Sequence, residues 1–139
     1  MQKISKQRTE SKTQLFITHF ECSPDEITKI LGISPTATWR KNDPIPKSTG
    51  GVRKVNGWRL ESPVKPTASP EGQINSLLEI VAPNINRFKQ LPTPSEVELS
   101  CAIYAYDESQ RVFGFSLQTV QLLAKMNATI GVAYYDLRK

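Results

Sequence analysis

The sequence is poor in the residues from which most catalytic and metal sites are built. Its 139 residues include one histidine, His19, and two cysteines, Cys22 and Cys101. A zinc site needs three or four protein ligands, and two widely separated cysteines do not make a disulfide framework. We therefore expect two reduced thiols packed as small hydrophobic side chains, with no metal and no cofactor.

Long apolar runs and nucleotide-binding motifs are also missing. No apolar run approaches the roughly 18 residues that span a bilayer, and the polar, basic residues 1–14 lack the apolar centre of a signal peptide. The pair Gly50-Gly51 lacks the Lys-Ser ending of a phosphate loop. These absences favour a cytoplasmic protein that stays out of the membrane, is not an enzyme and acts by binding.

The remaining candidates for catalysis are His19 and several carboxylate pairs. A Cys–His pair would need Cys22 within hydrogen-bond reach and a third, orienting group, and the sequence marks neither residue as activated. We interpret His19 as a histidine on the face of a strand. A site assembled from His19 and distant Asp or Glu side chains in one cleft is the third hypothesis that the sequence leaves open.

The positive charge is concentrated in two segments. Residues 1–14 hold four basic side chains and one acidic one, residues 40–65 hold seven basic and two acidic ones, and the rest of the chain is mildly acidic. The length favours one domain, and 38% hydrophobic and 22% charged residues suit a globular protein. We predict a flexible basic arm over residues 1–13 and a single α+β domain over residues 14–139.

Hydrophobic periodicity and capping residues predict the elements of this domain. Strand-like patterns cover residues 15–20, 55–62, 97–106 and 129–137. Helices are predicted after Ser23, Ser69 and Ser116, each of which can cap a helix, with Gly32 and Asn127 as left-handed terminators. Residues 111–115 are predicted to return as the hairpin partner of the strand at 97–106.

Two similar halves emerge from this order, each with a strand, a serine-capped helix and another strand. We predict two βαβ-like halves joined by a middle helix. They form one mixed four- to five-stranded sheet with helices packed on one face, a variant of the ferredoxin-like arrangement. The sequence leaves the order of the strands open.

Several short motifs in this order resemble a known family. They are the segments 23–27, 30–32, 39–43 and 57–60, the Leu77-Leu78 pair and the Ser116 helix. On these motifs the chain resembles the bacterial family called domain of unknown function 4279. Where that family usually has glycine, this chain has Asn42, and an asparagine in the left-handed region can replace it.

The resemblance implies little about activity. The family has no established function, and some of its members resemble proteins encoded beside secreted toxins. The resemblance therefore implies an immunity or antitoxin role, with a toxin as the protein partner.

One segment, residues 39–59, has the composition of a binding surface. Its candidate residues are Trp39, Arg40, Lys41, Arg53, Lys54, Trp58 and Arg59. Tryptophan and arginine are enriched in protein-binding hot spots, and aromatic and cationic side chains together also bind nucleic acid. A third interpretation of the segment is that both tryptophans pack against the sheet. The final strand leaves a sheet edge at which two copies can pair, so we expect a monomer or a homodimer.

Overall fold

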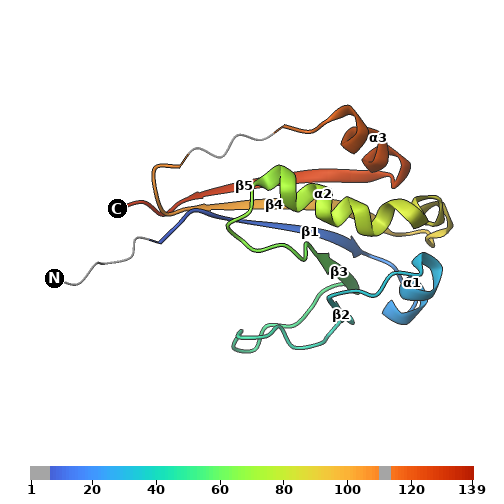
Figure 1. Ribbon diagram of the computed structural model, residues 1–139. Helices are drawn as coiled ribbons and strands as arrows, with labels where there is room; N and C mark the ends of the chain where they lie inside the picture. The colour runs from blue at the N-terminus through green and yellow to red at the C-terminus, as the bar shows by residue number, and fades with distance from the viewer. Residues whose placement is uncertain (1–6, 110–113) are drawn as a thin grey trace.

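A computed structural model of the protein describes residues 7–109 and 114–139. These residues form an α+β fold around one open, mixed five-stranded sheet, with the helices on one of its faces (Figure 1), which confirms the predicted fold class. The elements are β1 (Glu10–Thr18), α1 (Pro24–Leu31), β2 (Ala37–Trp39), β3 (Gly57–Glu61), α2 (Pro70–Val81), the 3₁₀ helix η1 (Ala82–Gln90), β4 (Glu96–Ala105), α3 (Leu117–Lys125) and β5 (Ala128–Asp136). Within the described part of the chain, every helix is too short or too polar to cross a bilayer.

The strands follow the order β2-β3-β1-β4-β5. Strand β1 is antiparallel to both of its neighbours, β3 and β4, and β2 is antiparallel to β3. Strands β1 and β2 therefore run in the same direction with β3 between them, which makes β1-α1-β2 a split βαβ unit. Strands β4 and β5 are parallel neighbours joined through α3, so the second half is a βαβ unit of the ordinary kind.

The ordered domain begins earlier than the sequence predicted. Strand β1 starts at Glu10 and pairs with β4 from its first residue, whereas order was predicted from Gln14. The prediction that residues 1–13 are a flexible arm is therefore wrong for residues 10–13, and residues 1–6 lie outside the described residues. The reason is that Ser11 and Thr13 are buried although both are polar, so they give no hydrophobic periodicity.

Two of the three serine residues predicted to cap helices make the expected side-chain hydrogen bond. Ser69 Oγ accepts a hydrogen bond from Gly72 N, and Ser116 Oγ accepts one from Thr119 N, each at 3.1 Å. Ser23 makes no such side-chain bond. The predicted left-handed positions also adopt that conformation, with φ values of 67° at Gly32, 77° at Asn42 and 55° at Asn127.

The predicted hairpin after β4 does not form within the sheet. Strand β4 has β1 on one side and β5 on the other, so both of its edges are already paired. Residues 114–116 are not part of any strand, and residues 110–113 of the predicted hairpin lie outside the described residues. The parallel strand β5 reaches the edge of β4 through the α3 crossover instead.

The hydrophobic core lies between the sheet and the helices. Leu15 and Ile17 of β1, Leu99 of β4, and the apolar stripe of α2 that includes Leu77 are almost fully buried there. Because side chains alternate along a strand, the other residues of each strand project from the opposite face. No helix in the described part of the chain covers this opposite face, which we call the helix-free face.

Candidate binding surface

The seven candidate residues of segment 39–59 do not form one surface, because β3 divides them. Trp58 and Leu60 point into the core, whereas Arg59 and Glu61 lie on the helix-free face. Trp58 pairs with Ile17 across the ladder, is fully buried, and donates a 3.1 Å hydrogen bond from Nε1 to Thr28 Oγ1 of α1. The prediction of Trp58 as a surface residue is therefore wrong, since its register assigns it to packing.

Trp39, in contrast, lies on the helix-free face at the end of β2. It pairs with Gly57, and its indole ring lies so close to that residue that a Cβ there would be 2.0 Å from Trp39 Cε2. Phe16 of β1 meets the ring edge-on at a centroid distance of 6.4 Å, and Arg53 Cζ lies over the ring, 4.2 Å from its centroid. We call Phe16, Trp39 and Arg53 the aromatic cluster.

A row of polar side chains continues from the aromatic cluster along the helix-free face. Arg59 Nη1 lies 3.1 Å from Gln14 Oε1 and 3.4 Å from Glu61 Oε2. Glu61 also pairs with Lys12 on β1 at 3.5 Å. The charge of Arg59 is therefore compensated by its neighbour, and the face carries both signs of charge rather than a continuous basic patch.

An open pocket of about 330 Å³ lies beside Trp39. It combines the indole, two prolines and two guanidinium groups, so it can accept an apolar side chain together with an anionic one. Its lining residues are Ala37, Thr38, Trp39, Asp43, Pro44, Pro46, Arg53 and Arg59.

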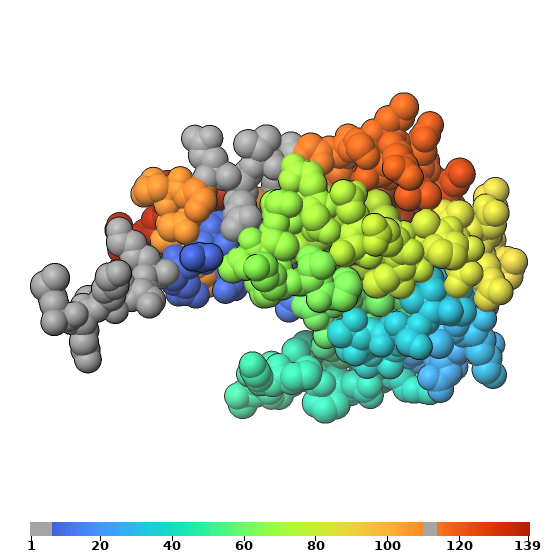
Figure 2. All heavy atoms as spheres, in the orientation of Figure 1, coloured from blue at the N-terminus to red at the C-terminus, as the bar shows by residue number. Residues whose placement is uncertain are grey.

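The other three candidate residues belong to the long loop of residues 40–56 and do not line this pocket. Arg40, Lys41 and Lys54 are exposed. The backbone N–H of Arg40 donates to Asp43 Oδ2 and that of Lys41 donates to Asn56 Oδ1, each at 2.8 Å, so these contacts shape the loop. Figure 2 shows the loop standing off from the body, with an open notch between it and the segment that leads into α2.

Two aromatic groups on this face were not predicted. Phe16 lies between the buried Leu15 and Ile17, and this alternation was the available signal that it faces away from the core. At the far end of the face, Tyr104 of β4 and Tyr135 of β5 stack at a centroid distance of 5.2 Å. No local pattern predicts that pair, because it depends on the register between two strands.

His19, the candidate catalytic residue, contacts two neighbouring polar side chains. His19 Nδ1 lies 3.2 Å from Glu96 Oε2 and 2.9 Å from Thr18 Oγ1 at an exposed position. Burial raises the pKa of Cys101 to about 11, and the nearby Thr13 hydroxyl opposes this shift only in part, so the thiol is protonated at neutral pH. Among the described residues, no group of three His, Cys, Asp or Glu side chains can hold a metal ion.

Comparison with known proteins agrees with the resemblance seen in the motifs. The model of a domain of unknown function, DUF4279, matches residues 9–137. The chain belongs to the DUF4279 family. Because the match begins at residue 9, it includes the first residues of β1. No curated protein and no solved structure matches the chain significantly.

Proposed function

We propose that this DUF4279 protein is a cytoplasmic, non-catalytic binding protein that holds a protein partner against the helix-free face of its sheet. In its most specific form, the proposal is immunity-type neutralisation of a bacterial toxin. The observation that carries it is the position of Trp39, which lies on an uncovered sheet face between Phe16 and Arg53.

The geometry of the aromatic cluster supports a protein partner. Tryptophan and arginine dominate the energetics of protein interfaces when they are held in place beside a pocket. Here the edge-on contact with Phe16 and the cation–π contact with Arg53 fix the indole before a partner arrives. A fixed side chain loses little conformational entropy on binding, so more of its contact energy contributes to affinity.

The charges of the face also favour a protein over a nucleic acid. A protein that binds phosphates displays a basic stripe, but Arg59 and Lys12 both pair with Glu61 here. Trp58, the second predicted base-stacking platform, is in the core. Nucleic-acid binding remains the alternative proposal, supported by the exposed side chains Arg40, Lys41 and Lys54 of loop 40–56 beside Trp39.

The test is capture and reconstitution with matched variants. The immobilised chain is mixed with an extract of its source organism, and any retained protein is identified by mass spectrometry, purified and titrated against the chain by calorimetry. We expect Trp39→Ala to weaken the complex by roughly 30-fold, as for an interface hot spot, and Lys54→Ala to change it by less than about threefold. Equal affinities of wild type and Trp39→Ala would contradict the proposed surface.

The same proteins separate the two proposals. In gel-shift titrations at low salt, the protein-binding proposal predicts no retardation of single- or double-stranded DNA or RNA. The nucleic-acid proposal predicts retardation that falls steeply with salt and that disappears when Arg40, Lys41, Arg53 and Lys54 are all replaced by glutamate. If the gel shifts show tight binding of a nucleic acid and the extract yields no bound protein, the nucleic-acid proposal replaces the protein-binding proposal.

A further inference from the structure

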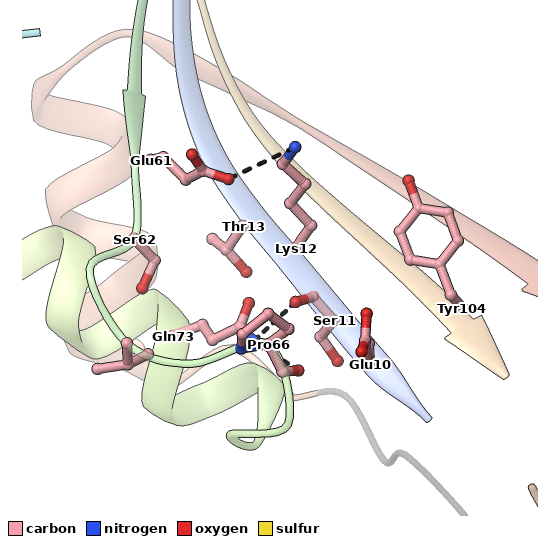
Figure 3. Close-up of a pocket in the computed structure, with 10 residues that line it drawn as sticks. Glu10, Ser11, Lys12, Thr13, Glu61, Ser62, Pro66, Gln73 and Tyr104 are labelled. Atoms are coloured by element: carbon pink, nitrogen blue, oxygen red, sulfur yellow. Dashed lines mark hydrogen bonds and ion pairs between the residues drawn. The ribbon is translucent and has the colours of Figure 1, made fainter. Parts of the chain in front are cut away.

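A second pocket opens at the point where β3 stops pairing with β1. Ser62 N donates to Thr13 O at 3.0 Å, and Ser11 N donates to Pro66 O at 2.8 Å. Between these two bonds the chain leaves the edge of β1, and the first turns of α2 lie behind the opening. The resulting pocket has a volume of about 240 Å³ and is drawn in Figure 3.

Gln73 of α2 forms the inner wall of this pocket, and its contacts determine how its amide is oriented. Its Nε2 donates to Ser11 O at 2.8 Å and to Pro66 O at 3.2 Å, with longer contacts to Lys65 O and Ala68 O. Carbonyl oxygens only accept hydrogen bonds, so the NH₂ end of the amide must face them. Oε1 is consequently the other end of the amide, and it is buried without a donor.

Three hydroxyl-bearing residues line the same pocket as this unpaired oxygen. The side-chain oxygens of Ser11 and Ser62 are buried and have no hydrogen-bond partner, and that of Thr13 has only the Cys101 thiol beside it. Figure 3 shows the Thr13 hydroxyl turned toward the amide of Gln73, with Ser62 on the other side of the opening. Among the described residues, the only other buried side-chain nitrogen or oxygen without a partner is Arg53 Nε. Unpaired buried polar atoms are rare in native proteins, so their concentration in one pocket indicates that something occupies it.

The chemistry of the walls selects the occupant. Gln73 Oε1 requires a hydrogen-bond donor, and the serine and threonine hydroxyls can all accept as well. At the mouth, Glu61 pairs with Lys12 and Arg59, whereas Glu10 makes no ion pair with a described residue. Val64 and Pro66 add an apolar wall. We propose that this pocket binds a small aliphatic primary amine, with its ammonium group toward Gln73 Oε1 and its alkyl stem along the apolar wall.

This proposal is independent of the aromatic cluster, because no residue lines both pockets. A charged head is costly to bury unless it is hydrogen-bonded and compensated. The unpaired oxygens supply the hydrogen bonds, and the carboxylate of Glu10 supplies the compensation, because Glu61 is already paired with Lys12 and Arg59. An anion of the same size would meet the acceptor Oε1 inside and the carboxylate of Glu10 at the mouth.

The experiment compares three probes with the same four-carbon stem: n-butylammonium, 1-butanol and butyrate. Each is titrated into the ¹⁵N-labelled full chain at neutral pH and followed by two-dimensional NMR. We expect n-butylammonium to shift the side-chain NH₂ signals of Gln73 and the amides of Ser11 and Thr13 in a saturable way. We expect 1-butanol to bind more weakly and butyrate to cause no saturable shift.

Matched serine variants test whether the pocket is the site. The double variant Ser11→Ala/Ser62→Ala removes two of the unpaired hydroxyls, and each lost hydrogen bond to a charged group weakens binding several-fold, so we expect roughly a tenfold loss of affinity. The control is Ser100→Ala on β4, which lies outside the pocket lining and should bind n-butylammonium like the wild type. If the double variant loses its dispersed NMR spectrum, Glu10→Gln at the mouth replaces it, with an expected loss of about threefold at low salt.

Three outcomes would overturn the proposal. The first is the absence of a saturable shift with n-butylammonium, which would mean that the buried oxygens hold water alone. The second is equal binding of butyrate and n-butylammonium. The third is wild-type affinity in a folded serine double variant or, if that variant is unfolded, in Glu10→Gln.

Discussion

Replacing Gly57 by alanine is the sharpest perturbation that the helix-free face offers. A Cβ at this position would lie 2.0 Å from Trp39 Cε2, 2.1 Å from Cζ2 and 2.4 Å from Nε1. The backbone of Gly57 lies outside the left-handed region, so alanine can adopt the same backbone conformation. The indole ring must therefore leave its position, which separates Trp39 from Phe16 and Arg53 without changing any of these three residues.

The cost of this displacement follows from the contacts that are lost. An edge-on aromatic pair contributes about 0.5–1.5 kcal/mol, and a partly exposed cation–π contact contributes about 0.5–1 kcal/mol. Alanine in a strand offsets about 0.5–1 kcal/mol of this loss, because it has less conformational entropy to lose than glycine. We expect Gly57→Ala to destabilise the protein by about 1 kcal/mol in the presence of Trp39, and to stabilise it slightly in a Trp39→Ala background.

The assay is urea unfolding of the four proteins of this double-mutant cycle, combined with acrylamide quenching of tryptophan fluorescence. Trp58 is fully buried, so an increase in quenching by Gly57→Ala reports on Trp39. The control is Gly131→Ala on β5, where a Cβ would meet only the flexible Glu98 carboxylate at 3.4 Å. If Gly57→Ala has the same effect with and without Trp39, the described position of the indole is refuted.

Three further predictions concern the core, the acid stability and the open sheet edge. Trp58→Phe should lower the free energy of unfolding by about 1–3 kcal/mol in urea titrations, because it leaves a cavity and removes the bond from Nε1 to α1. The hydroxyl of Ser109 and then that of Thr9 hold the pKa of Asp107 well below its ordinary value. Its stabilisation is thus complete above about pH 4 and is lost as the pH falls toward the folded-state pKa, so Asp107→Asn should flatten this acid dependence in unfolding curves recorded from about pH 2 to 6. Val132 is 53% exposed on β5, whose outer edge pairs with no described strand. Any self-association detected by sedimentation should disappear in Val132→Lys.

The fold could be predicted to the extent that its signals are local. Ser69 and Ser116 cap their helices through contacts within the next three residues, and the left-handed residues Gly32 and Asn127 end theirs. The alternation along β3 also separates Trp58 and Leu60, which are buried, from Arg59 and Glu61. Each of these features needs only the nearest residues in the sequence, so the amino-acid pattern is enough to identify it.

Features that depend on distant pairing were not predicted. The early start of β1 follows from its pairing with the end of β4, where Glu10 lies opposite Tyr104. Ser11 and Thr13 are buried by that pairing, but their hydroxyl groups resemble those of an exposed segment. The pocket beside Gln73 was missed for the same reason, because its unpaired oxygens become a cluster only when β1 and α2 come together.

One residue of register separates the two tryptophans of segment 39–59. Trp39 pairs with Gly57, and Trp58 pairs with Thr38, so the two tryptophans are on neighbouring pairs of the same ladder. Successive residues of a strand face opposite sides of a sheet, and consequently one indole stabilises the core while the other is presented on the helix-free face. Glycine at position 57 leaves room for the indole ring of Trp39 to approach β3 closely, where Phe16 and Arg53 contact it. A binding role for segment 39–59 therefore depends on its first tryptophan and on the glycine beneath it, rather than on the pair of tryptophans that the composition suggests.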